Sequence, residues 1–539
     1  MASRQKPVER ELKLILPGLE AETTIVEMIS AQGYRIKVLS IVTNVDLYLD
    51  TFDWLLMKKK LSLRYRISDG KSLYTIKSLG PIEDGIAVRR ETEVVLDKPV
   101  ATPTDIEEKQ ICSVVDEIIS PRKLLEQIQI RTQRRRYRVI SPEAAKFEMA
   151  FDTASFQLKG FHPQRSRRRL YELEAELLDG PPAALETLAK LFSGTCDYPP
   201  STLSKFESAF AHFKIAVPTK KPPAKHMVRW VDRLDLAVRK ILTYQLQKFH
   251  EQIEGIERDI DTEFVHQARV ATRRMRSCLR LFRDAVPVST GNFLAAELRW
   301  LAGLLGEVRD LDVFLLNLSD FQQQLGRFPE KQRIFFENWI AEHRRGPLAT
   351  LHQTFASSRY QNLERRLARF LSQPLPQRPR APLALKQVYE VAPQLINEKF
   401  EAVMKQGHAV LADPKLKEFH FLRIQMKKLR YACEFMSSAY EESLDPFIER
   451  TVEIQDCLGD IQDTVFTQNF IDTLFDNWKR NIVNPTLVFV LGEIYQLQKG
   501  IAAERERQFG KIWERFATEE TTAQLKESLQ GVATRSSNQ

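Results

Sequence analysis

The first residues whose types and spacing could do chemistry stand near the N-terminus. Val8 to Leu14 reads VERELKL, and in an extended chain Glu9, Glu11 and Lys13 share one face while the apolar residues take the other. Two carboxylates and one ammonium in a line can hold a divalent cation through oxygen and a phosphate through nitrogen. Chemistry on a polyphosphate ester or anhydride needs both.

Charged and apolar residues alternate in further segments up to about residue 175. The alternation predicts antiparallel strands with one apolar face. A solvent-facing sheet explains any single strand, but it would usually carry more uncharged polar residues. A closed barrel with a charged lumen explains the set, with a polyanion along one wall and metal ions along the other. The polar positions are Ser62, Arg64, Arg66, Thr75, Lys77, Arg89, Glu91, Glu93, Lys146, Glu148, Asp152, Glu172, Glu174 and Glu176.

The composition indicates a folded chain whose positive net charge would attract a polyanion. Its 539 residues predict about two to four domains, and 43% hydrophobic residues suffice for a core in each. The net charge of +9 points toward nucleic acid, an acidic membrane surface or polyphosphate. Apolar runs stay well below the roughly 20 residues of a membrane span, so we expect no membrane partner and a cytoplasmic protein. Five scattered cysteines indicate reduced thiols.

The elements that must position these residues divide the chain at one seam. Residues 8–180 are strand-like, and the pattern from Trp230 onward is helical. We therefore predict an α+β domain over 1–215, a Pro- and Lys-rich linker over 216–225, an all-α domain over 226–520 and a polar tail over 521–539. A second Pro-rich break, Gln373 to Pro382, divides the helical part.

The two halves of the helical part repeat each other. His266 and Arg269 align with His420 and Arg423 at an offset of 154, and LLGEVRD from residue 304 matches CLGDIQD from residue 457 at an offset of 153. This repetition predicts two copies of a helical bundle, over about 226–372 and 383–520, packed about a pseudo-twofold axis.

Each repeat carries a basic stripe along one helix. The basic residues of each stripe stand three or four positions apart, where like charges repel and destabilise a helix. Because both copies carry this destabilising pattern, we favour an anion-binding role over a solvated helix face. Nucleic acid is not expected as the partner, because neither stripe supplies aromatic residues for base stacking. The first stripe comprises His266, Arg269, Arg273, Arg276 and Arg280, and the second comprises His420, Arg423, Lys427 and Arg430, with Glu434 where the first has Arg280.

The residues of the first part resemble the CYTH family of triphosphate tunnel metalloenzymes. The match covers residues 7 to about 215 and follows the order of the motifs. The resemblance implies an eight-stranded antiparallel tunnel with flanking helices that grips a triphosphate. It rests on Glu9, Glu11, Lys13, Arg64, Arg66, Lys77, Arg89, Glu91, Asp152, Glu172, Glu174, Ser204 and Lys205.

The resemblance also implies a role for each matching residue. Phosphate contacts would come from Lys13, Arg64, Arg66, Lys77, Arg89 and Lys205, with Arg134 or Arg136 adding another. Ligands for Mg²⁺ or Mn²⁺ would be Glu9, Glu11, Glu91, Asp152, Glu172 and Glu174, and the catalytic residues would be Glu9, Glu11 and Lys13. Charge neutralisation and an activated water suffice for in-line attack on the terminal phosphorus without a covalent intermediate.

The helical part resembles the CHAD domain, which often follows a CYTH domain. The resemblance covers about residues 226–520 and implies binding of inorganic polyphosphate in a basic channel between the halves, with Lys428 beside the two stripes. The histidines would then donate hydrogen bonds to phosphate rather than ligate a metal, because arginines surround both. Binding of polyphosphate would also associate the protein with polyphosphate granules in the cytoplasm.

The function predicted from these features is an inorganic triphosphatase that carries a polyphosphate-binding module. The charged motifs say little about a base or vitamin, so adenylate cyclase and nucleoside or thiamine triphosphatase stay as alternatives. A non-catalytic polyphosphate-binding scaffold is a third. It could dispense with carboxylates, whereas this chain keeps Glu9, Glu11, Glu91, Glu172 and Glu174.

Overall fold

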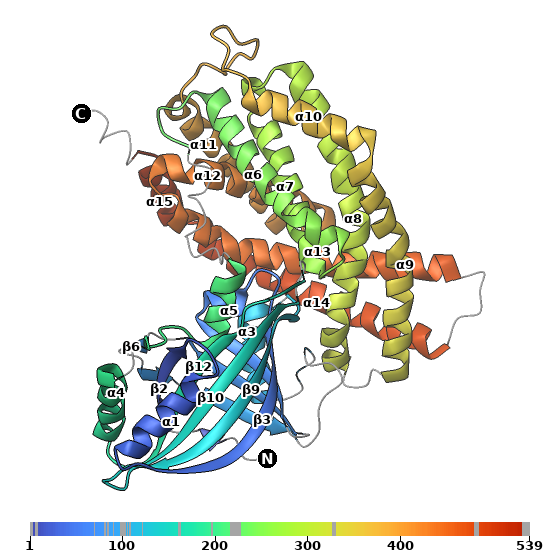
Figure 1. Cartoon of the computed structure of the whole chain (residues 1–539). Helices are drawn as coiled ribbons and strands as arrows, with labels where there is room; N and C mark the ends of the chain where they lie inside the picture. The colour runs from blue at the N-terminus through green and yellow to red at the C-terminus, as the bar shows by residue number, and fades with distance from the viewer. Residues whose placement is uncertain are drawn as a thin grey trace. The chain divides into compact units, whose positions relative to one another are not determined.

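The computed structural model describes residues 4–5, 9–68, 71–79, 82–83, 86–89, 91–96, 104, 106, 109–120, 122–159, 163–195, 198–215, 228–325, 330–478 and 485–530. The chain divides into two compact units, Met1–Lys220 and Lys221–Gln539. The first unit is an antiparallel sheet with helices and the second is helical, which confirms the predicted fold class (Figure 1). The predicted linker over 216–225 lies outside the described residues.

Long strands of alternating residues build the N-terminal unit, and in Figure 1 β3, β9 and β10 curve side by side. Its strands are β1 (Arg4–Gln5), β2 (Glu9–Leu16), β3 (Arg35–Asp50), β4 (Leu61–Ser68), β5 (Lys71–Ser78), β6 (Ile82–Glu83), β7 (Ile86–Arg89), β8 (Glu91–Leu96), β9 (Leu125–Ile140), β10 (Lys146–Leu158), β11 (Gln164–Arg165) and β12 (Leu170–Asp179). Its helices are α1 (Ala21–Ala31), α2 (Leu55–Lys58), α3 (Lys109–Ile119), α4 (Ala183–Thr195) and α5 (Lys205–Phe213).

The hydrogen-bonded order of the sheet is β1-β8-β5-β4-β3-β9-β10-β12-β2-β7-β6, with β11 on β10. This order is not closed among the described residues, which is where the structure departs from the predicted closed barrel. However, β7 ends at Arg89 and β8 begins at Glu91. The strands that lie one position in from the two ends of this order, β8 and β7, are therefore consecutive in the chain, although no described ladder joins them.

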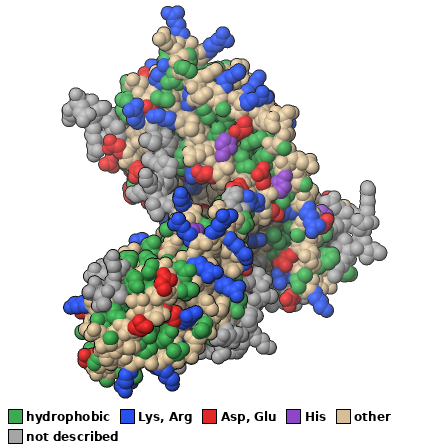
Figure 2. Space-filling model, in the orientation of Figure 1, with side chains coloured by type: hydrophobic (Ala, Val, Ile, Leu, Met, Phe, Trp, Pro, Cys, Tyr) green, Lys and Arg blue, Asp and Glu red, His purple; other side chains and the backbone are tan. Residues whose placement is uncertain are grey.

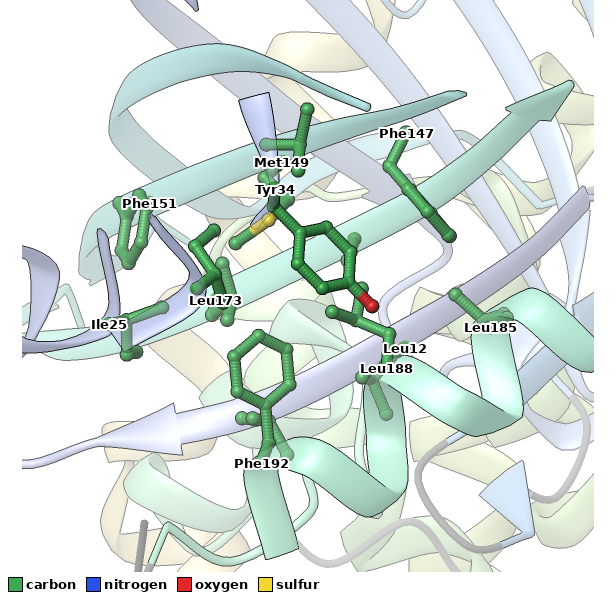
Figure 3. Close-up of a cluster of buried hydrophobic side chains, with 14 of the residues drawn as sticks. Leu12, Ile25, Tyr34, Phe147, Met149, Phe151, Leu173, Leu185, Leu188 and Phe192 are labelled. Atoms are coloured by element: carbon green, nitrogen blue, oxygen red, sulfur yellow. The ribbon is translucent and has the colours of Figure 1, made fainter. Parts of the chain in front are cut away.

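Apolar side chains of the strands point to the outer face, where helices cover them. Leu12, Phe147 and Leu173 pack against Ile25 of α1 and Phe192 of α4 (Figure 3). Helix α3 covers β4 and β5 in the same way. Because side chains alternate along a strand, burying this face turns the charged positions to the opposite, inner face.

Helix α5 closes one side of this inner face with aromatic rings. Phe206 stacks on Tyr48 with ring centroids 4.5 Å apart, and Phe210 meets Trp54 edge-on at 4.5 Å. All four side chains are buried. The helix starts sharply because Ser204 and Glu207 form a reciprocal capping box at its first turn. The residue next to this cap, Lys205, is thereby set at the wall of the interior.

The helices of the C-terminal unit fall into two matching series. The first series is α6 (Leu234–Glu257), α7 (Thr262–Leu281), α8 (Val288–Leu325), α9 (Glu330–Ala356) and α10 (Ser358–Ser372). The second is α11 (Val388–Ala412), α12 (Leu416–Met436), α13 (Asp445–Trp478), α14 (Pro485–Phe516) and α15 (Glu519–Gln530). Short 3₁₀ turns, Arg283–Ala285 and Ser437–Tyr440, follow α7 and α12.

The two series meet at the start of their first helices. Leu234 N donates to Lys386 O at 2.8 Å, and Val388 N donates to Asp232 O at 3.0 Å. The two donors, Leu234 and Val388, are 154 residues apart in the sequence, and so are the two acceptors, Asp232 and Lys386, as a twofold relation between repeats requires.

The end of the described chain differs from the sequence-based prediction of a polar tail from residue 521. Residues through Gln530 belong to α15, where Leu525 and Leu529 are buried, and Ser528 Oγ donates to Ser443 O at 2.9 Å. The prediction is wrong here because two apolar residues four positions apart are enough to dock a short helix. Residues 531–539 lie outside the described ones. Among the described helices, none has the length and apolar character needed to cross a membrane.

Candidate functional site

The inner face of the N-terminal sheet encloses a cavity of about 210 Å³. That volume holds about seven water molecules at about 30 Å³ each, enough for a small polyanion. Its described lining includes six basic and six acidic side chains. They are Lys13, Arg64, Arg66, Lys77, Arg134 and Lys205, with Glu11, Asp46, Glu93, Glu148, Glu174 and Glu176.

The N-terminal charged line enters this cavity from β2. Lys13 Nζ lies 2.9 Å from Glu11 and 2.9 Å from Glu174, which stands directly across on β12. Burial acts to lower the pKa of Lys13, but the carboxylates of Glu174 and Glu11 outweigh it and the pKa is raised. Lys13 is therefore a permanent cation in the lumen.

Lys205 stands where three carboxylates converge. Its Nζ lies 2.8 Å from Asp152 Oδ2, 3.0 Å from Glu172 Oε2 and 2.6 Å from Glu174 Oε1. Burial disfavours the charged ammonium, but these three acids hold the pKa of Lys205 well above its usual value. Asp152 and Glu172 are almost fully buried. Predicted phosphate and metal residues thus contact one another instead of occupying separate walls.

The three adjacent arginines of β9 separate by face. Arg134 forms a bidentate pair with Asp152 at 2.8 and 2.6 Å and also bonds Glu174. Arg136 makes a bidentate pair with Glu148 at 2.7 and 2.8 Å, beside the cavity lining. Arg135 points to the outer face, where it lies 3.1 Å from Glu22.

Partners on neighbouring strands hold the β4 arginines, and one of these partners, Asp46, was not singled out from the sequence. Arg66 pairs with Asp46 of β3 at 2.6 and 2.9 Å. Burial would raise the pKa of Asp46, but Arg66 outweighs it and the pKa is lowered. Arg64 donates to Thr75 at 3.1 Å, while its buried Nε has no hydrogen-bond acceptor in the described part of the chain. The available signal for Asp46 was the alternation of polar positions 44, 46 and 48 along β3.

Three predicted site residues have side chains outside the described ones: Glu9, Arg89 and Glu91. Their backbones are placed by strand register. Glu9 pairs with Arg89 across β2 and β7, and Glu91 pairs with Lys77 across β8 and β5.

In the C-terminal unit the basic stripes lie on α7 and α12. Arg273 of the first stripe lies close enough to Arg423 and Lys427 of the second to affect their pKa values. Burial lowers the pKa of Lys427 to about 7, and the nearby guanidinium groups of Arg423 and Arg273 add to the effect. Burial also lowers the pKa of Arg423, where Asp463 opposes the shift and Arg273 adds to it. Arg273 Nε and Arg309 Nη1 are buried and have no hydrogen-bond partner among the described residues. We call Arg273, Arg309, Arg423 and Lys427 the basic cluster.

The two stripe histidines occupy related surroundings. Burial lowers the pKa of His266, and the charge of Arg309 on α8 lowers it further. His420 Nδ1 lies 2.7 Å from Gln462 Oε1 on α13, the residue that aligns with Arg309. Asp310 and Asp463 make no ion pair with either stripe among the described contacts.

Other stripe residues are engaged elsewhere. The buried carboxylate of Glu434 forms ion pairs with Arg274 and with Arg430, each at 2.6 Å. Arg430 therefore already has an acidic partner. Lys428 donates to Gln425 at 3.3 Å. Arg276 and Arg280 line a separate cavity of about 290 Å³ with Arg283 and Arg299.

Arg269 approaches the backbone of α8 because Gly306 leaves space for it. Its Nη1 donates to Ala302 O at 3.2 Å, and a Cβ at Gly306 would stand 2.8 Å from that nitrogen. The glycine of the LLGEVRD segment therefore has a packing role.

Two family models match the chain, in the same order as the two units. The CYTH domain model matches residues 8–205, and the CHAD domain model matches residues 240–472. This chain joins a CYTH domain to a CHAD domain. The CYTH match contains the charged cavity from Glu11 to Lys205, and the CHAD match contains both basic stripes.

Solved structures similar to the chain include examples of both domains. The CHAD domain from the plant Ricinus communis is 21% identical, covers 57% of this chain and 96% of its own, and has a TM-score of 0.41. PptA from Streptomyces chartreusis is 16% identical over 52% of this chain and 100% of its own, with a TM-score of 0.42. HpAC1 from Hippeastrum, an adenylyl cyclase by name with a dominant triphosphatase activity, is 23% identical over 40% and 100%, with a TM-score of 0.29. No curated protein matches the chain.

CYTH enzymes depend on metal ions, and the donor chemistry of this cavity fits one. Carboxylate oxygens are the ligands that Mg²⁺ and Mn²⁺ prefer. No three acidic, histidine or cysteine side chains among the described residues are arranged around an open metal position. The convergence of Asp152, Glu172 and Glu174 is filled by the ammonium of Lys205. Glu172 Oε2 is buried and accepts no hydrogen bond from the described residues, so its contact with Lys205 is an ion pair only.

Basic and acidic side chains are both spread over the visible face of the protein (Figure 2). The charges that distinguish the CYTH cavity and the CHAD basic cluster are the buried or half-buried ones, such as Lys13, Arg64 and Lys427.

Proposed function

We propose that the CYTH domain is a metal-dependent inorganic triphosphatase, which cleaves triphosphate to diphosphate and phosphate, and that the CHAD domain binds inorganic polyphosphate. The observation that carries the first half is the cavity in which six basic and six acidic side chains meet. The acids can be neutralised by divalent cations, and the bases then remain for a ligand with about four negative charges.

Different residues of the cavity have different roles in hydrolysis. Lys13, Arg64 and Arg66 orient the phosphate groups and neutralise charge that develops on the leaving diphosphate. Glu11, 2.9 Å from Lys13, accepts the proton of the attacking water. A bound Mg²⁺ or Mn²⁺ supplies charge neutralisation and a water of lowered pKa. No protein nucleophile is required.

The cavity itself favours a small, compact anion. Its described lining is charged or polar apart from Tyr48, Leu79, Ala150 and Phe206. Tyr48 and Phe206 are stacked on each other, so they are not free to sandwich a base. This supports inorganic triphosphate over a nucleotide or thiamine ester.

The test is phosphate release from triphosphate, ATP and thiamine triphosphate with Mg²⁺ or Mn²⁺, with product analysis. We expect triphosphate to be the best substrate and a Glu11→Gln, Glu174→Gln variant of confirmed fold to lose release. Cyclic AMP from ATP would identify a cyclase. Release from no substrate, with polyphosphate still bound, would leave a non-catalytic scaffold.

The observation that carries the second half is the basic cluster of the CHAD domain, where buried donors on Arg273 and Arg309 have no acceptor within the described ranges. Bound phosphate would supply these acceptors. We expect Arg273→Met to weaken binding of long-chain polyphosphate strongly. Arg365→Met removes the same charge from the exposed face of α10 and serves as the control. Equal affinities of the two variants would contradict the assignment, and tighter binding of RNA than of polyphosphate would replace it.

A further inference from the structure

Three carboxylates of the CYTH domain share a single counter-charge. Asp152, Glu172 and Glu174 come from β10 and β12, and the ammonium of Lys205 lies 2.8, 3.0 and 2.6 Å from them. Arg134 also contacts Asp152 and Glu174. Glu172 has a different additional partner, Ser201 Oγ, which donates to it at 3.0 Å. Lys205 is therefore the described cation common to all three acids.

The backbone that carries Lys205 is tied down on both sides. Before it, Ser204 N donates to Glu207 Oε2 at 2.8 Å, and Ser201 N donates to Lys13 O at 2.9 Å. After it, the ring of Phe206 is stacked in the aromatic cluster of α5. A change in the position of the ammonium must therefore come from rotation of the Lys205 side chain, with α5 staying in place.

An ammonium and a divalent cation cannot share these carboxylates. Mg²⁺ binds carboxylate oxygens at about 2.0–2.1 Å, and a positive group held 2.6–3.0 Å from the same oxygens would overlap and repel it. The cavity continues from Lys205 to Lys13, Arg64 and Arg134, where a phosphate group would lie. The side chain thus has a second place to bind within reach of its rotation.

We propose that Lys205 is a displaceable internal cation, whose ammonium holds Asp152, Glu172 and Glu174 in the empty tunnel and turns onto a phosphate group when a divalent cation takes these carboxylates. The phosphate part of this inference rests on the proposed function. The exchange between ammonium and divalent cation does not. It makes divalent ions bind weakly until the polyanion gives the ammonium another partner.

The test is calorimetric titration of the full-length protein with Mn²⁺ in the absence of triphosphate. Removing the competing charge in Lys205→Met should tighten Mn²⁺ binding by at least about tenfold. Lys77→Met is the matched control, because Lys77 lines the same cavity from β5, whereas the three acids stand on β10 and β12. It should change the affinity much less. Lys205→Arg, which keeps the charge, should not tighten binding.

A second measurement uses the unaltered protein, in case Lys205→Met fails to fold. Acylation of Lys205 by an amine-reactive reagent, followed by mass spectrometry, should accelerate when Mn²⁺ saturates the protein, because the ammonium leaves its buried position. Unchanged Mn²⁺ affinity in a folded Lys205→Met variant, unchanged acylation, or no Mn²⁺ binding to any variant would each overturn the proposal. A protein without triphosphatase activity that still gives the tighter binding would reject the proposed function alone.

Discussion

At the scale of single residues, the position of a side chain within the sheet decides which charges can act on a ligand. Arg134 and Arg135 are neighbours in the chain, but Arg134 contacts Asp152 on the inner face of the sheet and Arg135 contacts Glu22 on the outer face. The pleat of the strand separates them. These two arginines therefore form a matched pair for testing the proposed function.

We predict that Arg134→Met lowers kcat/KM for triphosphate by on the order of a hundredfold, because a half-buried cation of the cavity lining is lost. Arg135→Met should retain activity within about twofold. Phosphate release under identical Mg²⁺ concentrations measures both. Similar losses in the two variants would show that net charge, and not the inner face, controls the rate.

The lowered pKa of Lys427 predicts how the affinity for polyphosphate depends on pH. Its pKa is lowered to about 7 by burial and by Arg423 and Arg273, so above that pH the free protein carries a neutral amine that a bound polyanion would reprotonate. Binding then takes up a proton, and affinity falls as pH rises from 7 to 9, by up to about tenfold per unit for one group. Below pH 7 the effect disappears, because Lys427 is charged in both states.

The measurement is calorimetry with polyphosphate at pH 7, 8 and 9, in buffers of different ionisation enthalpy that report proton uptake. Lys427→Met should bind more weakly at pH 7 and lose this dependence. His266 does not contribute to it, because burial and Arg309 lower its pKa from an ordinary value already below this range. A wild-type affinity that is flat between pH 7 and 9 would contradict the prediction.

At the scale of elements, small residues let the CHAD helices pack closely. Gly255 on α6 faces Phe264 on α7, and Gly407 on α11 faces Trp513 on α14, where an added Cβ would lie 2.1 and 1.9 Å from ring carbons. Trp513 and Phe264 are fully buried. Neither ring can retreat without disturbing its own core, so the glycines fix the helix spacing.

We predict that Gly407→Ala lowers the free energy of unfolding of the CHAD domain by about 2 kcal/mol or more, because overpacking forces the helices apart. Gly500→Ala is the control. It lies on the exposed face of α14 with no atom near the added Cβ, and it should stabilise the helix by about 0.5–1 kcal/mol. Urea unfolding followed by circular dichroism measures both. A neutral Gly407→Ala would mean that the helices adjust freely.

At the scale of the whole molecule, the chain is two compact units, Met1–Lys220 and Lys221–Gln539, each with its own buried core. The CYTH cavity is lined from the first unit and the basic cluster is drawn from the second. Each set of charges is therefore complete within one unit. A domain with its own core can in principle fold alone.

We predict that residues 1–220 and 221–539 fold when produced separately. The first should hydrolyse triphosphate with kcat within about twofold of the full chain, and the second should bind polyphosphate with unchanged affinity. Circular dichroism, phosphate release and calorimetry measure the three properties. A first fragment that folds but is inactive would show that catalysis needs the CHAD domain.

The sequence by itself determined the features that depend on periodicity. Alternation in VERELKL and the β4 strand placed Lys13, Arg64 and Arg66 on one face, because side chains of a strand must alternate. The matching basic stripes of the repeats fell on α7 and α12, with a helical period that is likewise local. Such patterns need no knowledge of distant contacts.

Tertiary structure alone decided which charges meet. Lys205 contacts acids 31 to 53 positions away in the chain, and Asp46 pairs with Arg66 from another strand. Strand register and the docking of α5 set these pairs, and no local spacing encodes either. For the same reason the sequence could not foresee that the predicted metal ligands and phosphate ligands hold one another, or that α15 extends the CHAD core to Gln530. Periodicity determines on which face of a strand or helix a residue lies, whereas tertiary packing determines which residues it contacts.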